Sequence, residues 1–224
     1  MVDLNDKTVP NPNKNPEKLE EERKTDGTRV LVYDGKQKYV TWPDPPPKDD
    51  IASVARYVMH ISEFGSLATN STHKGIEGYP FVNVFSVSDG PFNKSTGTPY
   101  FYFTPLELSV IDMKANNKVS LTVTEAQSDY CSKKGFDPED PRCSHAIFTG
   151  VMEKIEKDTE EEEFARNALF SRHVEMSSWP SNHDWFFGKI KIQHIYLLDF
   201  FGGAQVVDVE EYFAANPFES KKKD

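Results

Sequence analysis

The sequence predicts an α+β protein that is mostly β, a closed or half-closed antiparallel barrel with helices at intervals. Three observations predict this fold. Six apolar runs of strand length recur between residues 65 and 203. The clearest run, 118–126, alternates apolar and polar side chains with the period of a strand. Four segments with helical spacing or helix caps lie among the runs.

The first helix is expected just after Asp49 or Asp50, since either side chain can cap it. Its apolar face is formed by Ile51, Val54, Ala55 and Val58. Gly65 is a plausible stop for this helix. A short strand is expected at 65–70.

A loop rich in glycine and proline separates the next two strands. Residues 79–90 (YPFVNVFSVSDG) predict a strand that runs into this loop, and 99–105 (PYFYFTP) predict the strand that leaves it. A short helix over 106–117 follows. In the alternating strand 118–126, the valines and the leucine point to one face.

The second half of the chain predicts two strands and two helices. Residues 145–157 form a strand, and 159–173 form a helix with a threonine cap, acids in its first turn and basic residues near its end. Residues 184–203 predict a long strand with a break or bulge near Gln193 and His194. The last helix, over 207–217, begins at an aspartate and ends before a proline.

Composition divides the chain into three parts. Residues 1–48 are rich in Asn, Pro, Glu and Lys and predict a disordered or linker-like segment, with RVLVY at 29–33 as a candidate accessory strand. Residues 49–216 can bury a core and form the barrel domain. Residues 217–224 are expected to be a flexible tail.

Charge and hydropathy exclude two classes of partner. The net charge is −10, so the chain lacks the basic surface that a general nucleic-acid role needs. No apolar run reaches ~18 residues, so no membrane insertion is expected. No signal peptide is visible, which fits a cytosolic protein or a chain whose signal has been removed.

Two features favour the secretory pathway. Cys131 and Cys143 bracket a loop of turn-forming residues and predict a small disulfide, with two free thiols as the alternative. They do not predict zinc, which needs four ligands. Asn70 and Asn93 each begin a glycosylation sequon.

The stretch SNHDWFFG at 181–188 places His183 and Asp184 against three aromatic residues. Adjacent residues point to opposite sides of a strand, so the pair is poorly placed as a catalytic dyad, and a structural role is favoured. The six histidines form no HxH or HExxH pattern, and no GxSxG motif is present. We therefore expect no catalytic residue and no metal site, although any histidine could serve as an axial haem ligand.

Several long motifs resemble the CREG family of secreted and lysosomal glycoproteins. They include CSKKGFDPEDPRC at 131–143 and HDWFFGKIKIQHIYLLDFFGG at 183–203, and the resemblance covers about residues 50–213. It implies a six-stranded antiparallel split β-barrel of the FMN-binding type with flanking helices, forming a homodimer that has lost its flavin. It also implies a role in growth restraint, differentiation or lysosomal function. Glycans on the two sequons could route the protein to lysosomes through a sugar-recognising sorting receptor.

The residues support the loss of flavin independently. A flavin mononucleotide phosphate needs basic side chains or exposed backbone N–H groups, yet Lys94 is the only basic residue from Tyr79 to Met113. The resemblance further implies that a loop occupies the former cofactor pocket. Its residues are Ser88, Asp89, Gly90, Pro91, Gly97 and Pro99. No cofactor is expected, and the alternative function is a haem- or flavin-binding split barrel with redox activity.

Overall fold

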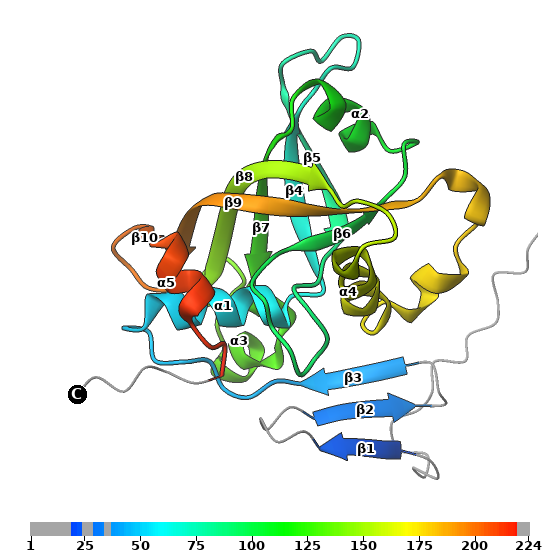
Figure 1. Ribbon diagram of the computed structural model, residues 1–224. Coiled ribbons are helices and arrows are strands. Elements are labelled where there is room, and N and C mark those ends of the chain that lie inside the picture. Colours follow the sequence, from blue (N-terminus) through cyan, green and yellow to red (C-terminus); the bar gives the residue numbers. More distant parts are fainter. Residues whose placement is uncertain (1–18, 24–28, 34–36, 219–224) are drawn as a thin grey trace, which may run out of the picture.

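The computed structural model describes residues 19–23, 29–33 and 37–218, with side chains from residue 42 onward. Its main sheet has seven antiparallel strands in the order β10-β9-β8-β7-β4-β5, with β6 paired to β9 (Figure 1). The strands are β4 (Phe64–Asn70), β5 (Pro80–Ser86), β6 (Tyr100–Phe103), β7 (Lys118–Thr124), β8 (His145–Lys154), β9 (Phe186–Leu198) and β10 (Gln205–Val207). The predicted α+β, mostly β fold is confirmed, and the three-residue β10 adds a seventh strand to the expected six.

The sheet curls into a half-closed barrel. Strand β5 ends the sheet on one side, while β6 lies against β9 on the other. Just beyond β5, Ser88 forms an isolated bridge with Tyr100, the first residue of β6. The barrel is therefore split between β5 and β6, and the loop that connects these strands begins at the split.

The predicted irregularity in the long strand is a β-bulge. Thr149 of β8 faces His194 of β9, but the next residue, Gly150, faces Ile192. Gln193 is therefore the extra residue. A side chain at Gly150 would place its Cβ 2.1 Å from the carbonyl oxygen of Lys191, so the bulge requires glycine opposite it.

Two helices cover the two ends of the barrel (Figure 1). The helices are α1 (Ile51–Ile61), α2 (Leu108–Ala115), α3 (Asp129–Lys134), α4 (Glu160–Phe170) and α5 (Val209–Ala214). Helix α1 is buried on almost every side, which is typical of a helix enclosed in a core. Helix α2 lies at the opposite end.

Local sequence signals explain most helix boundaries. The side chains of Asp50, Thr159 and Asp208 accept hydrogen bonds from the first turns of α1, α4 and α5, as predicted. Arg172 and His173, at the end of the predicted 159–173 helix, lie beyond the observed helix, because α4 ends at Phe170. Helix α3, inside the cysteine loop, was not predicted.

The core lies between α1 and the inner face of the sheet. Val119, Leu121 and Val123 of β7 all point into it, as their alternation predicts. The prediction of Gly65 as a helix stop was wrong, because α1 ends at Ile61 and Gly65 lies within β4. A Cβ there would lie 2.8 Å from the backbone carbonyl oxygen of Thr122, so this glycine is a packing requirement.

Part of the N-terminal segment forms a second, three-stranded antiparallel sheet. It consists of β1 (Leu19–Arg23), β2 (Arg29–Tyr33) and β3 (Gln37–Thr41). The accessory strand predicted at 29–33 is present, whereas its two partners were not predicted. Residues 1–18, and 219–224 of the predicted tail, lie outside the described residues.

The domain packs somewhat beyond its predicted limits of 49 and 216. The Trp42 ring lies 5.3 Å from that of His60 and 6.2 Å from that of Phe218. The ring of Phe218 in turn contacts Tyr57 at 6.3 Å. Both ends of the described domain therefore close over the same end of α1.

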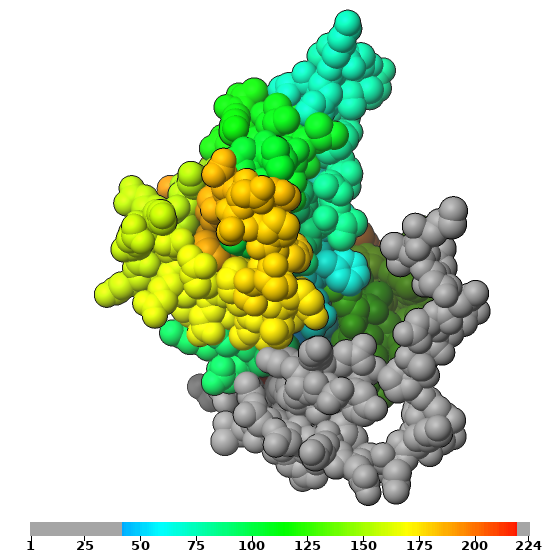
Figure 2. All heavy atoms as spheres, turned by 90° about the vertical axis from the view of Figure 1, so that its right-hand side faces the viewer, coloured from blue at the N-terminus to red at the C-terminus, as the bar shows by residue number. Residues whose placement is uncertain are grey.

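Helix α4 and the segment before β9 cover one side of the barrel, and the 71–79 loop projects beyond it (Figure 2). No helix in the described part of the chain has the length and hydropathy to cross a membrane.

Candidate functional site

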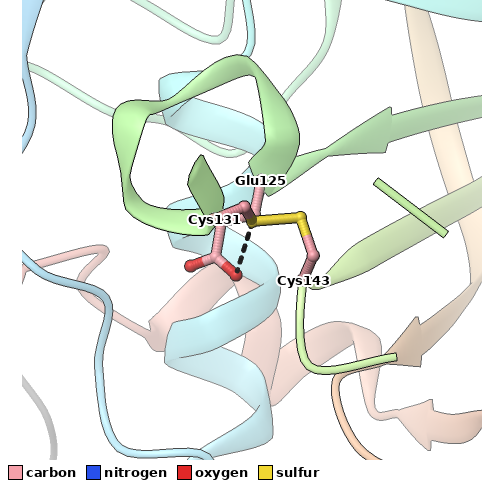
Figure 3. A group of neighbouring side chains, drawn as sticks. All are labelled: Glu125, Cys131 and Cys143. Atoms are coloured by element: carbon pink, nitrogen blue, oxygen red, sulfur yellow. Dashed lines mark hydrogen bonds between the residues drawn. A yellow bond between two sulfur atoms is a disulfide. The ribbon is translucent and has the colours of Figure 1, made fainter. Parts of the chain in front are cut away.

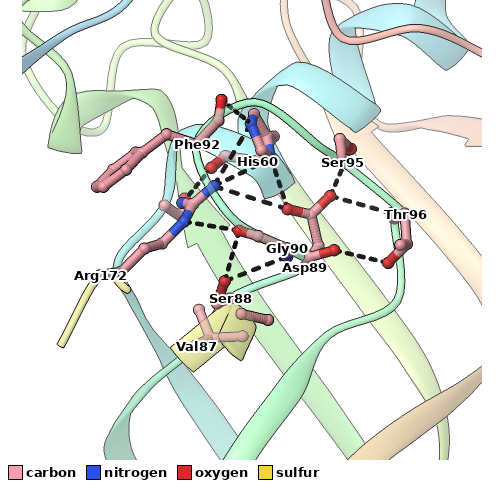
Figure 4. A network of polar contacts seen from close by, with 12 residues as sticks. His60, Val87, Ser88, Asp89, Gly90, Phe92, Ser95, Thr96 and Arg172 are labelled. Carbon is pink, nitrogen blue, oxygen red and sulfur yellow. Dashed lines mark hydrogen bonds and ion pairs between the residues drawn. The ribbon is translucent and has the colours of Figure 1, made fainter. Parts of the chain in front are cut away.

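The loop between β5 and β6 is held in place by a buried polar cluster, which we call the His60–Asp89–Arg172 cluster (Figure 4). The side chains of all three residues are 0% exposed. Asp89 lies in the loop, His60 in the last turn of α1, and Arg172 just beyond α4. The cluster therefore joins three parts of the chain that lie far apart in the sequence.

Asp89 is the centre of the cluster. Its Oδ1 lies 2.6 Å from His60 Nδ1 and 3.9 Å from Arg172 Nη2. Its Oδ2 accepts hydrogen bonds from Ser95 Oγ at 2.5 Å and from the Gly97 backbone N–H at 2.9 Å. The carboxylate thus organises its own loop while it binds the side chains of His60 and Arg172.

Arg172 holds the loop from the other side. Its Nε donates to the carbonyl of Gly90 at 2.9 Å, and its Nη1 donates to the carbonyl of His60 at 2.5 Å. The guanidinium also lies over the rings of Phe92 and Trp42, at 5.0 and 5.4 Å. Its hydrogen-bonding groups are engaged with the protein itself.

The charges of the cluster determine its titration. Burial alone would raise the pKa of Asp89, but the charge and hydrogen bond of His60, helped by Arg172 and Ser95, lower it from 3.8 to about 2. Burial lowers the pKa of Arg172 to about 10, against the opposing effect of Asp89. Because the Asp89 pKa is depressed, its stabilising contribution is present above about pH 4 and is lost as the pH falls towards 2.

The structure places the predicted loop residues close together. Ser88, Asp89, Gly90, Gly97 and Pro99 are buried and Pro91 is half-buried. Tyr212 of α5 donates from its hydroxyl to the carbonyl of Gly97 at 2.7 Å. The loop is therefore packed into the protein along most of its length.

The turn before α2 contains a second unusual carboxyl. Glu107 precedes the helix, and its Oε2 lies 3.5 Å from the backbone N–H of Thr104. Burial raises the pKa of Glu107 to about 7, only partly offset by that hydrogen bond. Above pH 7 the Glu107 carboxyl group becomes negatively charged, and it would then repel a phosphate group placed next to it.

Glu107 gives a pH-dependent prediction. Because its pKa is raised in the folded state, its ionisation destabilises the fold as the pH rises through 7 and has no such effect below about 4.5. Glu107→Gln should therefore raise the melting temperature at pH 8, and the gain should disappear at pH 4.5. Thermal unfolding at the two pH values measures this. An equal gain at both would contradict the prediction.

Cys131 and Cys143 form a disulfide with an S–S distance of 2.10 Å beside the buried Glu125 (Figure 3). The three side chains lie close enough to resemble a metal site. A disulfide supplies no thiolate, however, so they do not form one. Glu125 instead accepts from the backbone N–H of Ser144 at 3.0 Å and lies 3.6 Å from Lys48 Nζ.

The disulfide is expected to stabilise the domain by restricting the unfolded chain. Replacing Cys131 and Cys143 together by serine should lower the free energy of unfolding by about 3 kcal/mol, the loop-entropy value for a ring of this size. Urea unfolding with and without a reductant measures it. The reductant should lower the free energy of unfolding of the parent protein by the same amount. It should leave the free energy of unfolding of the double variant unchanged. A loss under ~1 kcal/mol would contradict the entropic explanation.

The residues of the 181–188 stretch make packing and hydrogen-bonding contacts with the rest of the domain. Asp184 adopts a left-handed backbone conformation at φ 52° and ends a short 3-10 helix. The His183 carbonyl accepts a hydrogen bond from Thr104 Oγ1 at 2.6 Å. Trp185 packs against Tyr102 at 4.8 Å and donates to the Pro180 carbonyl. No hydrogen bond joins His183 to Asp184 within the described part of the chain.

Sequence reasoning missed the His60–Asp89–Arg172 cluster. His60 is completely buried, and both of its ring nitrogens have partners. Asp89 and Arg172 are 29 and 112 positions away from it in the chain. No local pattern joins such residues, so only the fold brings them together.

Comparison with solved structures defines the class of protein. The "heme binding protein from Mycobacterium smegmatis" matches with a TM-score of 0.60 at 17% identity, over 77% of this chain and 62% of that one. This chain therefore spans less than two thirds of that protein. Campylobacter jejuni ChuZ matches with a TM-score of 0.55 at 11% identity, over 93% of this chain and 89% of that one. The fold is a split barrel.

Comparison of sequences then gives the family. The family model described as "CREG, beta-barrel" matches residues 46–214. Protein CREG1 of Mus musculus is 49% identical over 171 residues, which are 76% of this chain and 77% of that protein. Protein CREG2 of Homo sapiens is 48% identical over 173 residues, 77% of this chain and 59% of that protein. The chain belongs to the CREG family.

Proposed function

We propose that this protein is a non-enzymatic glycoprotein of the CREG type, secreted or lysosomal, that binds no flavin and acts as a homodimer. The observation that carries the proposal is the loop at 88–99. It begins at the split between β5 and β6, and the His60–Asp89–Arg172 cluster holds it at the end of the barrel that α1 covers. We infer that it fills the space that a flavin needs in cofactor-binding relatives of the fold.

The charges around the loop support this proposal. A flavin phosphate carries two negative charges and needs cationic partners. Lys94 is exposed at the edge of the loop, 5.0 Å from the ring of Phe164, and Arg172 is buried in the cluster. The carboxyl group in the loop is Asp89. Arg56 and Arg172 also contact the loop, but both are buried and donate to carbonyl groups of the protein, so neither is exposed to a phosphate.

An enzyme assay tests the proposal. The purified protein should oxidise NADPH in the presence of added flavin mononucleotide no faster than a heat-inactivated sample. Turnover that disappears when Arg172 or His60 is replaced, in a variant that remains folded, would contradict the proposal and favour redox activity.

A secretory route is supported by the two sequons and the disulfide. Asn70 and Asn93 are both exposed, so a glycosyltransferase can reach them. We propose that their glycans direct the protein to lysosomes through a sugar-recognising receptor, where it acts in growth restraint, differentiation or lysosomal function. Replacing both asparagines by glutamine should remove the glycan-dependent mobility shift and reduce lysosomal delivery. Unchanged delivery would contradict this route.

The homodimer is supported by an exposed apolar surface on and around β5, the edge strand of the sheet. Val82 and Val84 are 58% and 60% exposed, and Tyr79 before the strand is 67% exposed. Leu108 and Ile111 of α2 are also exposed. Exposed edges of this kind are normally covered, and a second copy would cover the same surface on both chains.

Sedimentation tests the dimer. Val82→Lys with Val84→Lys should convert a dimer at micromolar concentration into a monomer without loss of folding. Phe200→Lys, at an apolar residue that is 58% exposed outside this surface, should leave the dimer intact. A parent protein that sediments as a monomer would contradict the proposal.

A further inference from the structure

A pocket opens at the end of the barrel that α2 covers. Its volume is about 340 Å³. It lies between α2, the end of β6, the end of β8 and the start of β9. The residues that line it are Phe103, Pro105, Val110, Met113, Lys114, Met152, Lys154, Asp184 and Phe186. This size is at the lower limit of the ~300–1,000 Å³ that is typical of small-molecule sites.

The wall of the pocket is apolar. Phe103 and Val110 belong to the core and are 0% and 2% exposed. Met113 and Met152 are each 9% exposed, and Phe186 is half-buried. Methionine is flexible and polarisable, so two of them give the wall an adaptable shape. These side chains form the inner wall of the pocket and offer a place for an apolar group.

The rim of the pocket carries more positive than negative charge. Lys114, in the last turn of α2, and Lys154, at the end of β8, are both exposed. Neither lysine has a carboxylate within ion-pair distance among residues 42–218; Lys154 Nζ lies 4.8 Å from the Phe186 ring. Asp184 supplies the one acid. A cationic rim is distinctive in a chain whose net charge is −10.

The pocket is separate from the other surfaces described. Helix α2 turns Val110 and Met113 towards the pocket and exposes Leu108 and Ile111 elsewhere. None of the loop residues at 88–99 lines the pocket. A ligand here would therefore depend neither on the proposed dimer nor on the loss of flavin.

We propose that this pocket binds a small amphipathic carboxylate of the medium-chain fatty acid class. The apolar chain lies against Met113, Met152 and Phe186, and the carboxylate lies at the rim with Lys114 and Lys154. Burial of the chain supplies most of the affinity. The two ammonium groups select an anion over a neutral or cationic head group.

Calorimetric titration of the full chain tests the proposal, with sodium decanoate as the probe below its micellar concentration. Decanol and decylamine have the same chain with a neutral and a positive head. Both should bind at least about tenfold more weakly than decanoate, because they lack the charge attraction. From hexanoate to decanoate, affinity should rise about fourfold for each methylene until the pocket is full.

Three variants locate the site. Lys114→Glu combined with Lys154→Glu should weaken decanoate binding about tenfold or more. Lys134→Glu makes the same kind of charge change on α3, at the other end of the barrel, and should have no effect. Asp184→Asn removes the competing carboxylate, and asparagine tolerates the left-handed backbone there, so decanoate should bind a few-fold more tightly.

Three outcomes would overturn the proposal. The first is the absence of binding by decanoate at millimolar concentration to a protein that circular dichroism shows to be folded. The second is equal binding of decanoate and decanol, which would mean that the pocket does not select an anion. The third is binding that the two lysine substitutions leave unchanged, which would place decanoate outside this pocket.

Discussion

Arg172→Met is expected to lower the free energy of unfolding by about 3–5 kcal/mol, the typical loss when one partner of a buried ion pair is removed. The substitution leaves the buried Asp89 carboxylate without its arginine. It also leaves the carbonyls of Gly90 and His60 without the donors that now lie at 2.9 and 2.5 Å. Buried polar atoms that lose their partners are costly. Urea unfolding at pH 7 measures the change.

A second arginine provides the control. Arg166 of α4 pairs with Glu162 at 2.9 Å, but its side chain is 49% exposed. Arg166→Met should therefore cost no more than about 1 kcal/mol, as is usual for a surface ion pair. Similar losses for the two variants would mean that the cluster does not hold the loop.

Gly90→Ala is the second substitution with a large expected effect. Gly90 has φ 152°, and a Cβ there would lie 1.8 Å from the carbonyl oxygen of Lys94. The loop backbone would have to move, and the hydrogen bond from Arg172 to the Gly90 carbonyl would be lost. Backbone strain of about 1–3 kcal/mol adds to that loss. We expect the free energy of unfolding to fall by at least about 3 kcal/mol in total, measured by urea unfolding.

Gly75→Ala separates backbone strain from the close approach. Gly75 also has a positive φ, at 89°, but a Cβ there would have no atom within 4 Å. Its substitution should lower the free energy of unfolding by only about 1–2 kcal/mol, which is the effect of placing a side chain on a residue with positive φ. If Gly90→Ala were as mild as Gly75→Ala, the loop would be free to relax.

The sequence predicts features that depend on neighbouring residues. The alternation in 118–126 indicates the buried face of β7, and Asp208 indicates the start of α5. The pattern around Gln193 indicates the bulge in β9, because the apolar positions change phase there. Each signal lies within a few residues of the feature that it specifies.

Features that depend on the tertiary fold were not predictable in this way. Strand β10 has three residues and exists only because it pairs with Ile195–Leu197 of β9. Helix α3 lies in a loop whose composition indicates turns. The His60–Asp89–Arg172 cluster needs three distant segments to meet. For the loop at 88–99, only the family resemblance pointed to its residues, and the structure adds how they are held.

We propose that the loop at 88–99, held by the His60–Asp89–Arg172 cluster, leaves no place for a flavin. The most direct test is a visible absorption spectrum of the purified protein, before and after addition of flavin mononucleotide and then haem, with free ligand removed. We predict no retained flavin band and no Soret band. A retained flavin band near stoichiometric amount would contradict the claim, and a Soret band would identify a haem-binding protein instead.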